Sequence, residues 1–107
     1  MRGCRVKEKS YKLIMVVVSK GKASKVVDIT TKAGADGGTI LFGHGAAVRL
    51  MLGISVEPER EIVVTLVEED KVQAVVHDLE NELELNEPHK GIVFVLSVDQ
   101  AIGLCNE

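Results

Sequence analysis

The chain has 107 residues, of which 46% are hydrophobic and 3% aromatic, and this corresponds to one small domain with an aliphatic core. That hydrophobic fraction excludes a disordered chain. The formal net charge of −3 at pH 7 argues against a nucleic-acid-binding protein, because such proteins are typically basic.

The first ten residues predict a basic tail that precedes a single domain over residues 11–107. The apolar run at residues 13–18 is too short for the core of a signal peptide, and lysines follow it directly. We therefore expect no targeting segment and no transmembrane span. The two cysteines, Cys4 and Cys105, are too few for a disulfide framework, so the expected location is the reducing cytoplasm.

The first half of the domain predicts a strand, a helix and a second strand. Residues 11–18 are rich in β-branched side chains, and Ser-Lys-Gly ends that strand. Residues 23–33 predict a helix, and Gly34 occupies the position of a helix-terminating glycine. Residues 39–42 predict the second strand, and an irregular segment is expected over residues 43–59. The predicted helix carries one apolar stripe: Ala23, Val26, Val27, Thr30 and Ala33.

The second half repeats this order. Residues 62–67 predict a strand, and Asp70 can cap the helix that follows it. Asn86, Glu87 and Pro88 are expected to end that helix, and residues 92–98 predict the last strand. The second helix also has a narrow apolar stripe: Val72, Val75, Val76, Leu79 and Leu83.

Strand-helix-strand repeated twice predicts an α+β fold, the ferredoxin-like β-α-β-β-α-β sandwich. Two helices would cover one face of a four-stranded antiparallel sheet. Three of the strands are nevertheless apolar on both faces, so the uncovered face would be a larger apolar patch than monomers usually carry. We therefore expect a homo-oligomer that packs these sheet faces together. The alternative is that residues 43–59 of the same chain cover part of this face.

The order and spacing of these segments resemble the P-II signalling family over residues 12–104. The resemblance implies a trimer that binds adenine nucleotides in clefts between subunits and signals to a target protein through a loop. It also implies a regulator of nitrogen metabolism rather than an enzyme. The segments that carry it are KLIMVVV (12–18), KASKVVDITTKAGADGGTI (22–40), IVVTLVEEDKVQAVVHDLENEL (62–83) and HKGIVFVLSVDQAIGL (89–104).

The expected nucleotide site combines this resemblance with two glycine-bearing turns. The resemblance places Thr39 at a nucleotide-contacting threonine and three apolar residues around the adenine. The turns FGHG (42–45) and PHKG (88–91) offer backbone N–H groups and basic side chains to an anion, although each is also explained as a simple turn. The full set is Val16, Thr39, Gly43, His44, Gly45, Val64, Leu66, His89, Lys90 and Gly91.

Three departures from the family pattern affect what this site would bind. The loop after the second strand is short, and the only tyrosine, Tyr11, lies in the first strand, so modification of a loop tyrosine is excluded. The two C-terminal arginines of the family fall at Gly103 and Cys105. Losing two guanidinium groups removes strong contacts to a polyphosphate. We expect no tightly bound cofactor. The effector is expected to be ATP, ADP or AMP, and the missing arginines favour ADP, AMP or a different anionic ligand over ATP, with a role for magnesium open.

The loop insertion at about residues 43–60 is unusually apolar. One interpretation is a docking segment that inserts into a target protein, either a membrane transporter or an enzyme. The other is that it folds back over the sheet edge or a neighbouring subunit. The residues concerned are Val48, Arg49, Leu50, Met51, Leu52 and Ile54.

The sequence predicts neither a metal site nor a catalytic group. No histidine or cysteine spacing is typical of metal ligands, and His77 is expected to face solvent on the second helix. An enzyme would need His44 or His89 in the cleft. The remaining alternative is a trimer of the related CutA type, which shares the fold, binds divalent metal or has a structural role, and does not depend on nucleotide.

Overall fold

The computed structural model describes residues 10–44, 49–51, 54–56, 59–88 and 90–103. Along the chain its elements are β1 (Tyr11–Ser19), α1 (Ala23–Lys32), β2 (Thr39–His44), β3 (Arg49–Met51), β4 (Ile54–Val56), β5 (Glu59–Glu68), the 3₁₀ turn η1 (Glu69–Lys71), α2 (Val72–Glu82) and β6 (Ile92–Ser97). No helix in these ranges is both long enough and apolar enough to cross a membrane.

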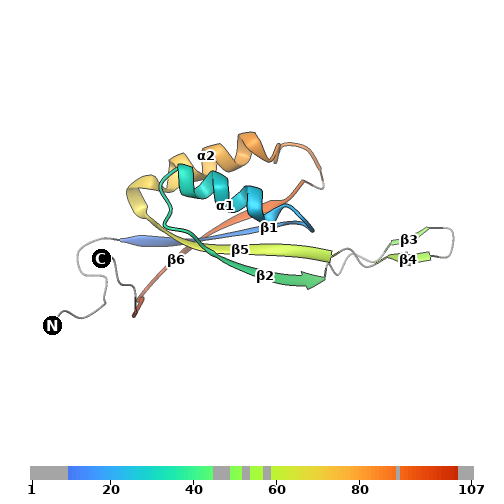
Figure 1. Cartoon of the computed structure of the whole chain (residues 1–107), viewed down its shortest axis with the longest axis horizontal. Helices are drawn as coiled ribbons and strands as arrows, with labels where there is room; N and C mark the ends of the chain where they lie inside the picture. The colour runs from blue at the N-terminus through green and yellow to red at the C-terminus, as the bar shows by residue number, and fades with distance from the viewer. Residues whose placement is uncertain (1–9, 45–48, 52–53, 57–58, 89, 104–107) are drawn as a thin grey trace.

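The main sheet has four antiparallel strands in the order β2-β5-β1-β6. Both helices lie on one face of it, above the strands in Figure 1. The ferredoxin-like α+β fold expected from the repeated strand-helix-strand pattern is confirmed. β3 and β4 form a separate two-stranded sheet beyond the end of β2 and β5.

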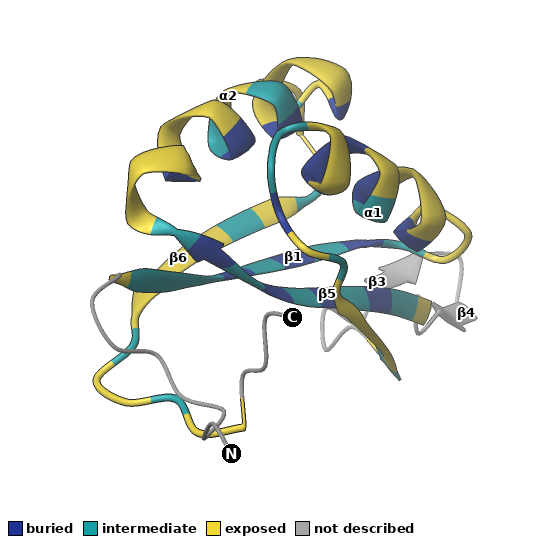
Figure 2. Cartoon of the chain, turned by 60° about the vertical axis from the view of Figure 1, so that its left-hand side comes forward, coloured by how far each residue is buried: buried dark blue, intermediate teal, exposed yellow. Residues whose placement is uncertain are grey.

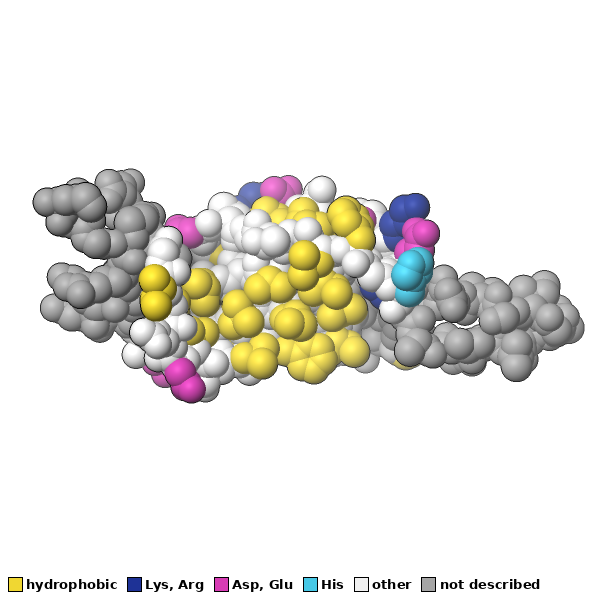
Figure 3. Space-filling model, turned by 90° about the horizontal axis from the view of Figure 1, so that it is seen from below, with side chains coloured by type: hydrophobic (Ala, Val, Ile, Leu, Met, Phe, Trp, Pro, Cys, Tyr) yellow, Lys and Arg dark blue, Asp and Glu magenta, His cyan; other side chains and the backbone are white. Residues whose placement is uncertain are grey.

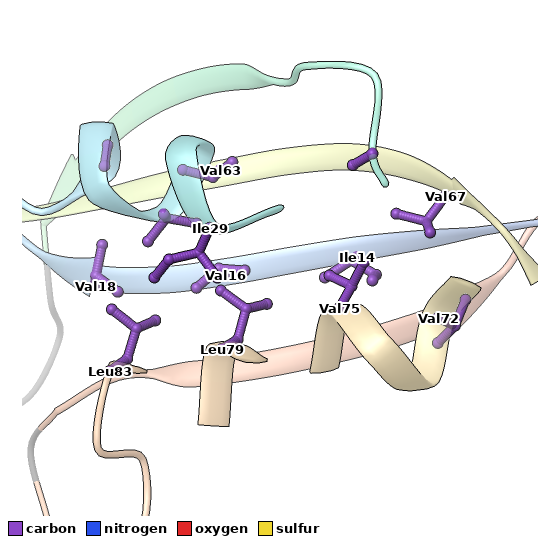
Figure 4. Packing of buried hydrophobic residues seen from close by; sticks show 13 residues of the cluster. Ile14, Val16, Val18, Ile29, Val63, Val67, Val72, Val75, Leu79 and Leu83 are labelled. Carbon is purple, nitrogen blue, oxygen red and sulfur yellow. The ribbon is translucent and has the colours of Figure 1, made fainter. Parts of the chain in front are cut away.

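The core lies between the helices and the sheet. Side chains of a strand alternate between the two faces, so every second residue of β1 and β5 points to the helices. Figure 2 shows the buried residues on the sides of the helices that face the sheet, and Figure 4 shows their packing. The buried apolar residues are Ile14, Val16, Val18, Ala23, Val26, Ile29, Ala35, Val63, Val67, Val72, Val75, Leu79 and Leu83.

α1 agrees closely with its prediction. Gly34 has a φ of 122°, its N–H donates to Thr31 O, and the N–H of Ala35 donates to Thr30 O. This pair of hydrogen bonds is the Schellman motif that a glycine permits after a helix. The predicted stripe differs at three positions: Ile29, which was not predicted, is buried, and Val27 and Ala33 are only partly buried against the core.

The predicted boundaries of α2 were wrong at both ends. Asp70 lies within η1, and the N-cap of α2 is Lys71, which makes no side-chain capping bond. The helix ends at Glu82, with Leu83 as its cap, four residues before Asn86. A 3₁₀ turn commonly leads into an α-helix, and its tighter geometry moves the capping position. The predicted apolar stripe is confirmed except that Val76 is only partly buried.

The prediction of an irregular segment over residues 43–59 was also wrong. β2 continues to His44, β5 begins at Glu59, and β3 pairs with β4 in antiparallel register from Arg49↔Val56 to Met51↔Ile54. In the sequence only two residues separate these short strands, and the second is a glycine. That spacing is a hairpin signal, although the strands themselves are too short to show a clear alternation.

The start of α1 depends on a buried carboxylate from β5. The Ala23 N–H donates to Glu61 Oε1 over 2.8 Å, and Glu61 is 9% exposed. Glu61→Ala is expected to lower the free energy of unfolding by about 2 kcal/mol, because the buried N–H loses its acceptor. Glu61→Gln keeps an oxygen acceptor, so its loss should stay below about 1 kcal/mol. Urea denaturation at one fixed protein concentration measures both, and equal losses would contradict this capping role.

Candidate functional site

The sheet face opposite the helices is apolar and open. Met15 of β1 pairs with Val64 of β5 on one side and with Phe94 of β6 on the other. In the central part of these three strands, every second residue points to the same face and is apolar. Figure 3 shows these side chains as a continuous hydrophobic patch. β3 and β4 extend away from the sheet end and leave this face uncovered. We call it the bare sheet face, formed by Leu13, Met15, Val17, Leu41, Ile62, Val64, Leu66, Ile92, Phe94 and Leu96.

A pocket of about 390 Å³ opens at one edge of the bare sheet face, where β2 begins. The turn before β2 forms one wall, because Gly37 has a φ of 94° and Gly38 lies against β5. A Cβ added at Gly38 would be 3.2 Å from Val64 O, so the close approach depends on glycine. We call it the Thr39 pocket, lined by Tyr11, Leu13, Asp36, Gly37, Gly38, Thr39, Val64, Thr65 and Leu66.

The chemistry of the Thr39 pocket suits a neutral group better than a phosphate. Among the described residues that line it, Asp36 is the only charged one, and its carboxylate would repel an anion. Leu13, Val64 and Leu66 supply apolar contact, and Tyr11 and Thr39 supply hydroxyl groups. The Thr65 hydroxyl already donates to Gly37 O and holds the glycine turn in place. A flat, partly polar ring fits such a lining.

A second pocket of about 300 Å³ lies at the other end of β2 and is lined by Lys20, Phe42, Gly43, His44, Glu59 and Arg60. Lys20 Nζ is 2.9 Å from Glu59 Oε1. The hydrogen bond and the opposite charge lower the pKa of Glu59 and raise the pKa of Lys20. Both groups therefore stay ionised near neutral pH, and each charge largely neutralises the other.

Lys90 lies at the opposite edge of the sheet. It precedes β6, which is separated from β2 by two intervening strands. Lys90 Nζ is 3.2 Å from Glu84 Oε1. Gly91 has a φ of 146°, and a Cβ added there would be 3.0 Å from Val17 O. The Lys90–Gly91 turn therefore packs closely against the end of β1 and lies away from the Thr39 pocket.

One chain brings together only part of the predicted nucleotide site. Thr39, Val64 and Leu66 meet in the Thr39 pocket, and Gly43 and His44 share the second pocket. Val16 is 0% exposed and points to the helices, on the other face of the sheet from Val64. Lys90 and Gly91 form a third group. Gly45 and His89 lie outside the described residues.

The predicted docking residues are described only through their backbone. Arg49, Leu50 and Met51 form β3, and Ile54 belongs to β4. Val48 and Leu52 lie outside the described residues. The pairing of β3 with β4 shows that the insertion contains a two-stranded antiparallel ribbon, so the docking interpretation concerns this ribbon rather than an irregular loop.

Sequence reasoning missed most of the Thr39 pocket. Asp36, Gly37 and Gly38 lie in the AGADGG segment between the first predicted helix and the second predicted strand, where the sequence predicted no binding residue. Its double glycine next to Thr39 was the available signal, because consecutive glycines also permit close approach to a neighbouring strand. Tyr11 and Leu13 gave no signal, since strand pairing alone brings them to the pocket.

His77 faces solvent as predicted, and its Nε2 is 3.0 Å from Asn81 Nδ2. Within the described ranges, no three His, Cys, Asp or Glu side chains come close enough together to hold a metal ion.

Comparison with known proteins identifies the family and its fold. The family model "Nitrogen regulatory protein P-II" matches residues 11–107. No match was found among curated proteins.

Three solved structures illustrate the likeness of the fold. GlnK of B. subtilis in complex with ATP is 19% identical, with 84% of this chain and 85% of that chain covered and a TM-score of 0.67. CPII of Thiomonas intermedia K12, bound to ADP, AMP and acetate, is 20% identical, with coverages of 90% and 92% and a TM-score of 0.65. CutA of Synechococcus elongatus PCC7942 is 14% identical, with coverages of 91% and 84% and a TM-score of 0.66.

Proposed function

Because the chain belongs to the P-II family of nitrogen regulatory proteins, whose members are signalling regulators rather than enzymes, we propose that it is a homotrimeric regulator of a target protein controlled by an adenine nucleotide. The domain of this regulator spans residues 11–107, with residues 1–10 as a basic tail, and its compartment is the cytoplasm. The observation that carries the proposal is the Thr39 pocket at the edge of the bare sheet face.

The trimer is the proposed partner of the bare sheet face. Ten apolar side chains on one face form a larger patch than a monomer usually exposes, and members of this family form trimers. Burying this face against two further copies removes its apolar area from water, which favours association. The Thr39 pocket lies at the border of this face, so a neighbouring subunit would complete its open side.

The nucleotide is proposed to bind between subunits, with its base in the Thr39 pocket. Val64 and Leu66 would contact the ring, and the Thr39 hydroxyl would hydrogen-bond to it. The phosphates would lie away from Asp36, near Lys90 and the glycine-bearing turns. Within one chain Thr39 lies on the edge strand β2 and Lys90 precedes β6 at the opposite edge of the sheet, so a site that uses both needs two subunits. The complexes of GlnK with ATP and of CPII with ADP and AMP support an adenine nucleotide as the effector.

Control of the target is proposed to pass through residues 43–60. These residues connect β2, which borders the Thr39 pocket, to β5, which also lines it. A nucleotide that binds one arrangement of this insertion more tightly shifts the population toward that arrangement. The β3–β4 hairpin would then present its surface to the target, a membrane transporter or an enzyme, or withdraw it. The target-binding residues proposed are Val48, Arg49, Leu50, Met51, Leu52 and Ile54.

Isothermal titration with ATP, ADP and AMP, each with and without magnesium, tests the proposal. The wild-type protein should bind saturably, close to one nucleotide per chain. Thr39→Val should weaken all three nucleotides about fivefold, because it removes one hydrogen bond to the base. Lys90→Ala should weaken ADP and ATP about tenfold, because it removes a charged contact to phosphate. Lys25→Ala, on exposed α1, is the control for loss of a positive charge.

The absence of saturable binding to every nucleotide would contradict the proposed function. The second candidate is then a CutA-type trimer, which the likeness to CutA at a TM-score of 0.66 favours. That candidate predicts binding of a divalent metal such as copper or zinc in the same calorimeter, with no effect of any nucleotide.

A further inference from the structure

Glu84 has an unusual backbone conformation. Its φ is 55°, and among the described residues it is the only one other than glycine with a positive φ. It follows Leu83, the cap of α2, at the position where helices most often have glycine. A side chain in this left-handed region costs conformational free energy, and such outliers are a starting point for functional hypotheses.

The turn around Glu84 is held in place on both sides. The Leu85 N–H donates to Glu80 O over 3.1 Å, and the Glu87 N–H donates to Glu84 O over 3.0 Å. Leu85 is half-buried against the core, and a Cβ added at Gly91 would lie 3.4 Å from its Cδ2. The turn after α2 therefore packs against the start of β6, which fixes Glu84 beside Lys90.

The Glu84 carboxylate forms an ion pair with the ammonium group of Lys90. Their Oε1 and Nζ atoms are 3.2 Å apart, and the two side chains are 59% and 40% exposed. An ion pair this exposed adds little to stability. The ion pair therefore adds little stability to offset the strain of a glutamate at a position where glycine would be unstrained. Its clearest consequence is that Lys90 is neutralised by a group within its own chain.

We propose that Glu84 is a specificity-determining residue that competes with the ligand's phosphates for Lys90. This inference rests on the proposed function, in which Lys90 contacts phosphate. With Glu84 in place, each added negative charge on the ligand gains attraction from Lys90 and meets repulsion from the carboxylate beside it. The wild-type site therefore discriminates weakly between AMP, ADP and ATP. Without the carboxylate, affinity rises with the number of phosphates.

Calorimetric titration of Glu84→Gln with AMP, ADP and ATP at one ionic strength tests this proposal. A unit charge a few ångströms away in a water-exposed site changes binding by about fivefold. We expect Glu84→Gln to bind ATP about fivefold more tightly than wild type and AMP less than twofold more tightly. Raising the salt concentration should reduce the gain in ATP affinity, because salt screens the interactions of Glu84 and Lys90 with the phosphates.

Three further variants test whether the gain comes from loss of the Glu84 carboxylate, whether it acts through Lys90, and whether it is an effect of overall charge. Glu84→Gly also removes the carboxylate and suits the left-handed backbone, so it should reproduce the gain even if glutamine disturbs the turn. The double variant Glu84→Gln with Lys90→Ala should show no gain over Lys90→Ala alone. Glu82→Gln removes an exposed carboxylate two residues earlier and should leave every affinity within twofold.

The outcomes distinguish this proposal from the proposed function. Nucleotide binding that is unchanged in both Glu84 variants would overturn the role of Glu84 and leave the proposed function standing. A gain that persists without Lys90, or that Glu82→Gln reproduces, would also overturn it, because the effect would then be one of overall charge. No binding by wild type or any variant would reject the proposed function, and the role of Glu84 with it.

Discussion

Replacing Phe94 by lysine is expected to convert the proposed trimer into monomers. Phe94 lies on β6 in the bare sheet face and is 46% exposed in the single chain. It pairs with Met15 and stands among apolar neighbours. Packing this face against other subunits would bury the new ammonium group without a partner, which costs several kcal/mol per subunit. Light scattering coupled to size-exclusion chromatography measures the mass directly.

Val95→Lys is a matched control for that substitution. Val95 is the next residue of β6 and is 45% exposed, but it pairs with Ile14 and therefore lies on the helix-covered side of the sheet. This variant should retain the mass of a trimer. If the wild-type protein is already a monomer, or if both variants keep the same oligomeric mass as wild type, the bare sheet face does not mediate self-association.

Gly91→Ala is expected to lower the free energy of unfolding by about 2 kcal/mol. The φ of 146° at Gly91 lies in a region that residues with a side chain rarely adopt, and the added Cβ would meet Val17 O at 3.0 Å and Val18 Cγ1 at 3.2 Å. One of those contacts is with backbone, so rotation of a side chain cannot relieve it. The strain should also displace Lys90, so nucleotide affinity should fall together with the urea midpoint.

Gly43→Ala provides the comparison for stability. A Cβ at Gly43 would meet only Ile62 Cδ1, at 3.9 Å, which is an ordinary contact. Its free energy of unfolding should change by less than about 1 kcal/mol, and in the stabilising direction, because alanine restricts the unfolded chain. Equal destabilisation by the two alanines would show that Gly91 is not specially constrained.

The sequence predicted the fold well because each main element carries a long, regular signal. The β-branched runs of β1 and β5 and the apolar stripes of α1 and α2 need only their own periodicity to be recognised. Gly34 shows the same for a single residue, since helix termination by glycine is local chemistry. The prediction was wrong where the signal is short or depends on neighbours. The strands β3 and β4 have three residues each, and η1 moved the start of α2 past Asp70.

In the candidate site, too, the residues that depend on contacts between distant segments were the ones that the sequence did not predict. Thr39, Val64 and Leu66 came from a family resemblance, and strand pairing brings them into one pocket with Tyr11 and Leu13. Val16 was predicted to join them, but side chains alternate between the two faces along β1, and that of Val16 points into the core. The contact of Glu84 with Lys90 was invisible in the sequence, because it arises from the way the turn after α2 packs against β6.

By itself, the sequence determined that this chain is a small ferredoxin-like sandwich with an apolar sheet face in excess of what two helices cover. Periodicity and composition are properties of short stretches of sequence, so they can be recognised without knowledge of the tertiary structure. Only the tertiary structure decided which residues share a pocket, that Lys90 lies across the sheet from Thr39, and that Glu84 neutralises it. Those relations depend on strand order, register and turn geometry, which are set by packing between segments far apart in the chain.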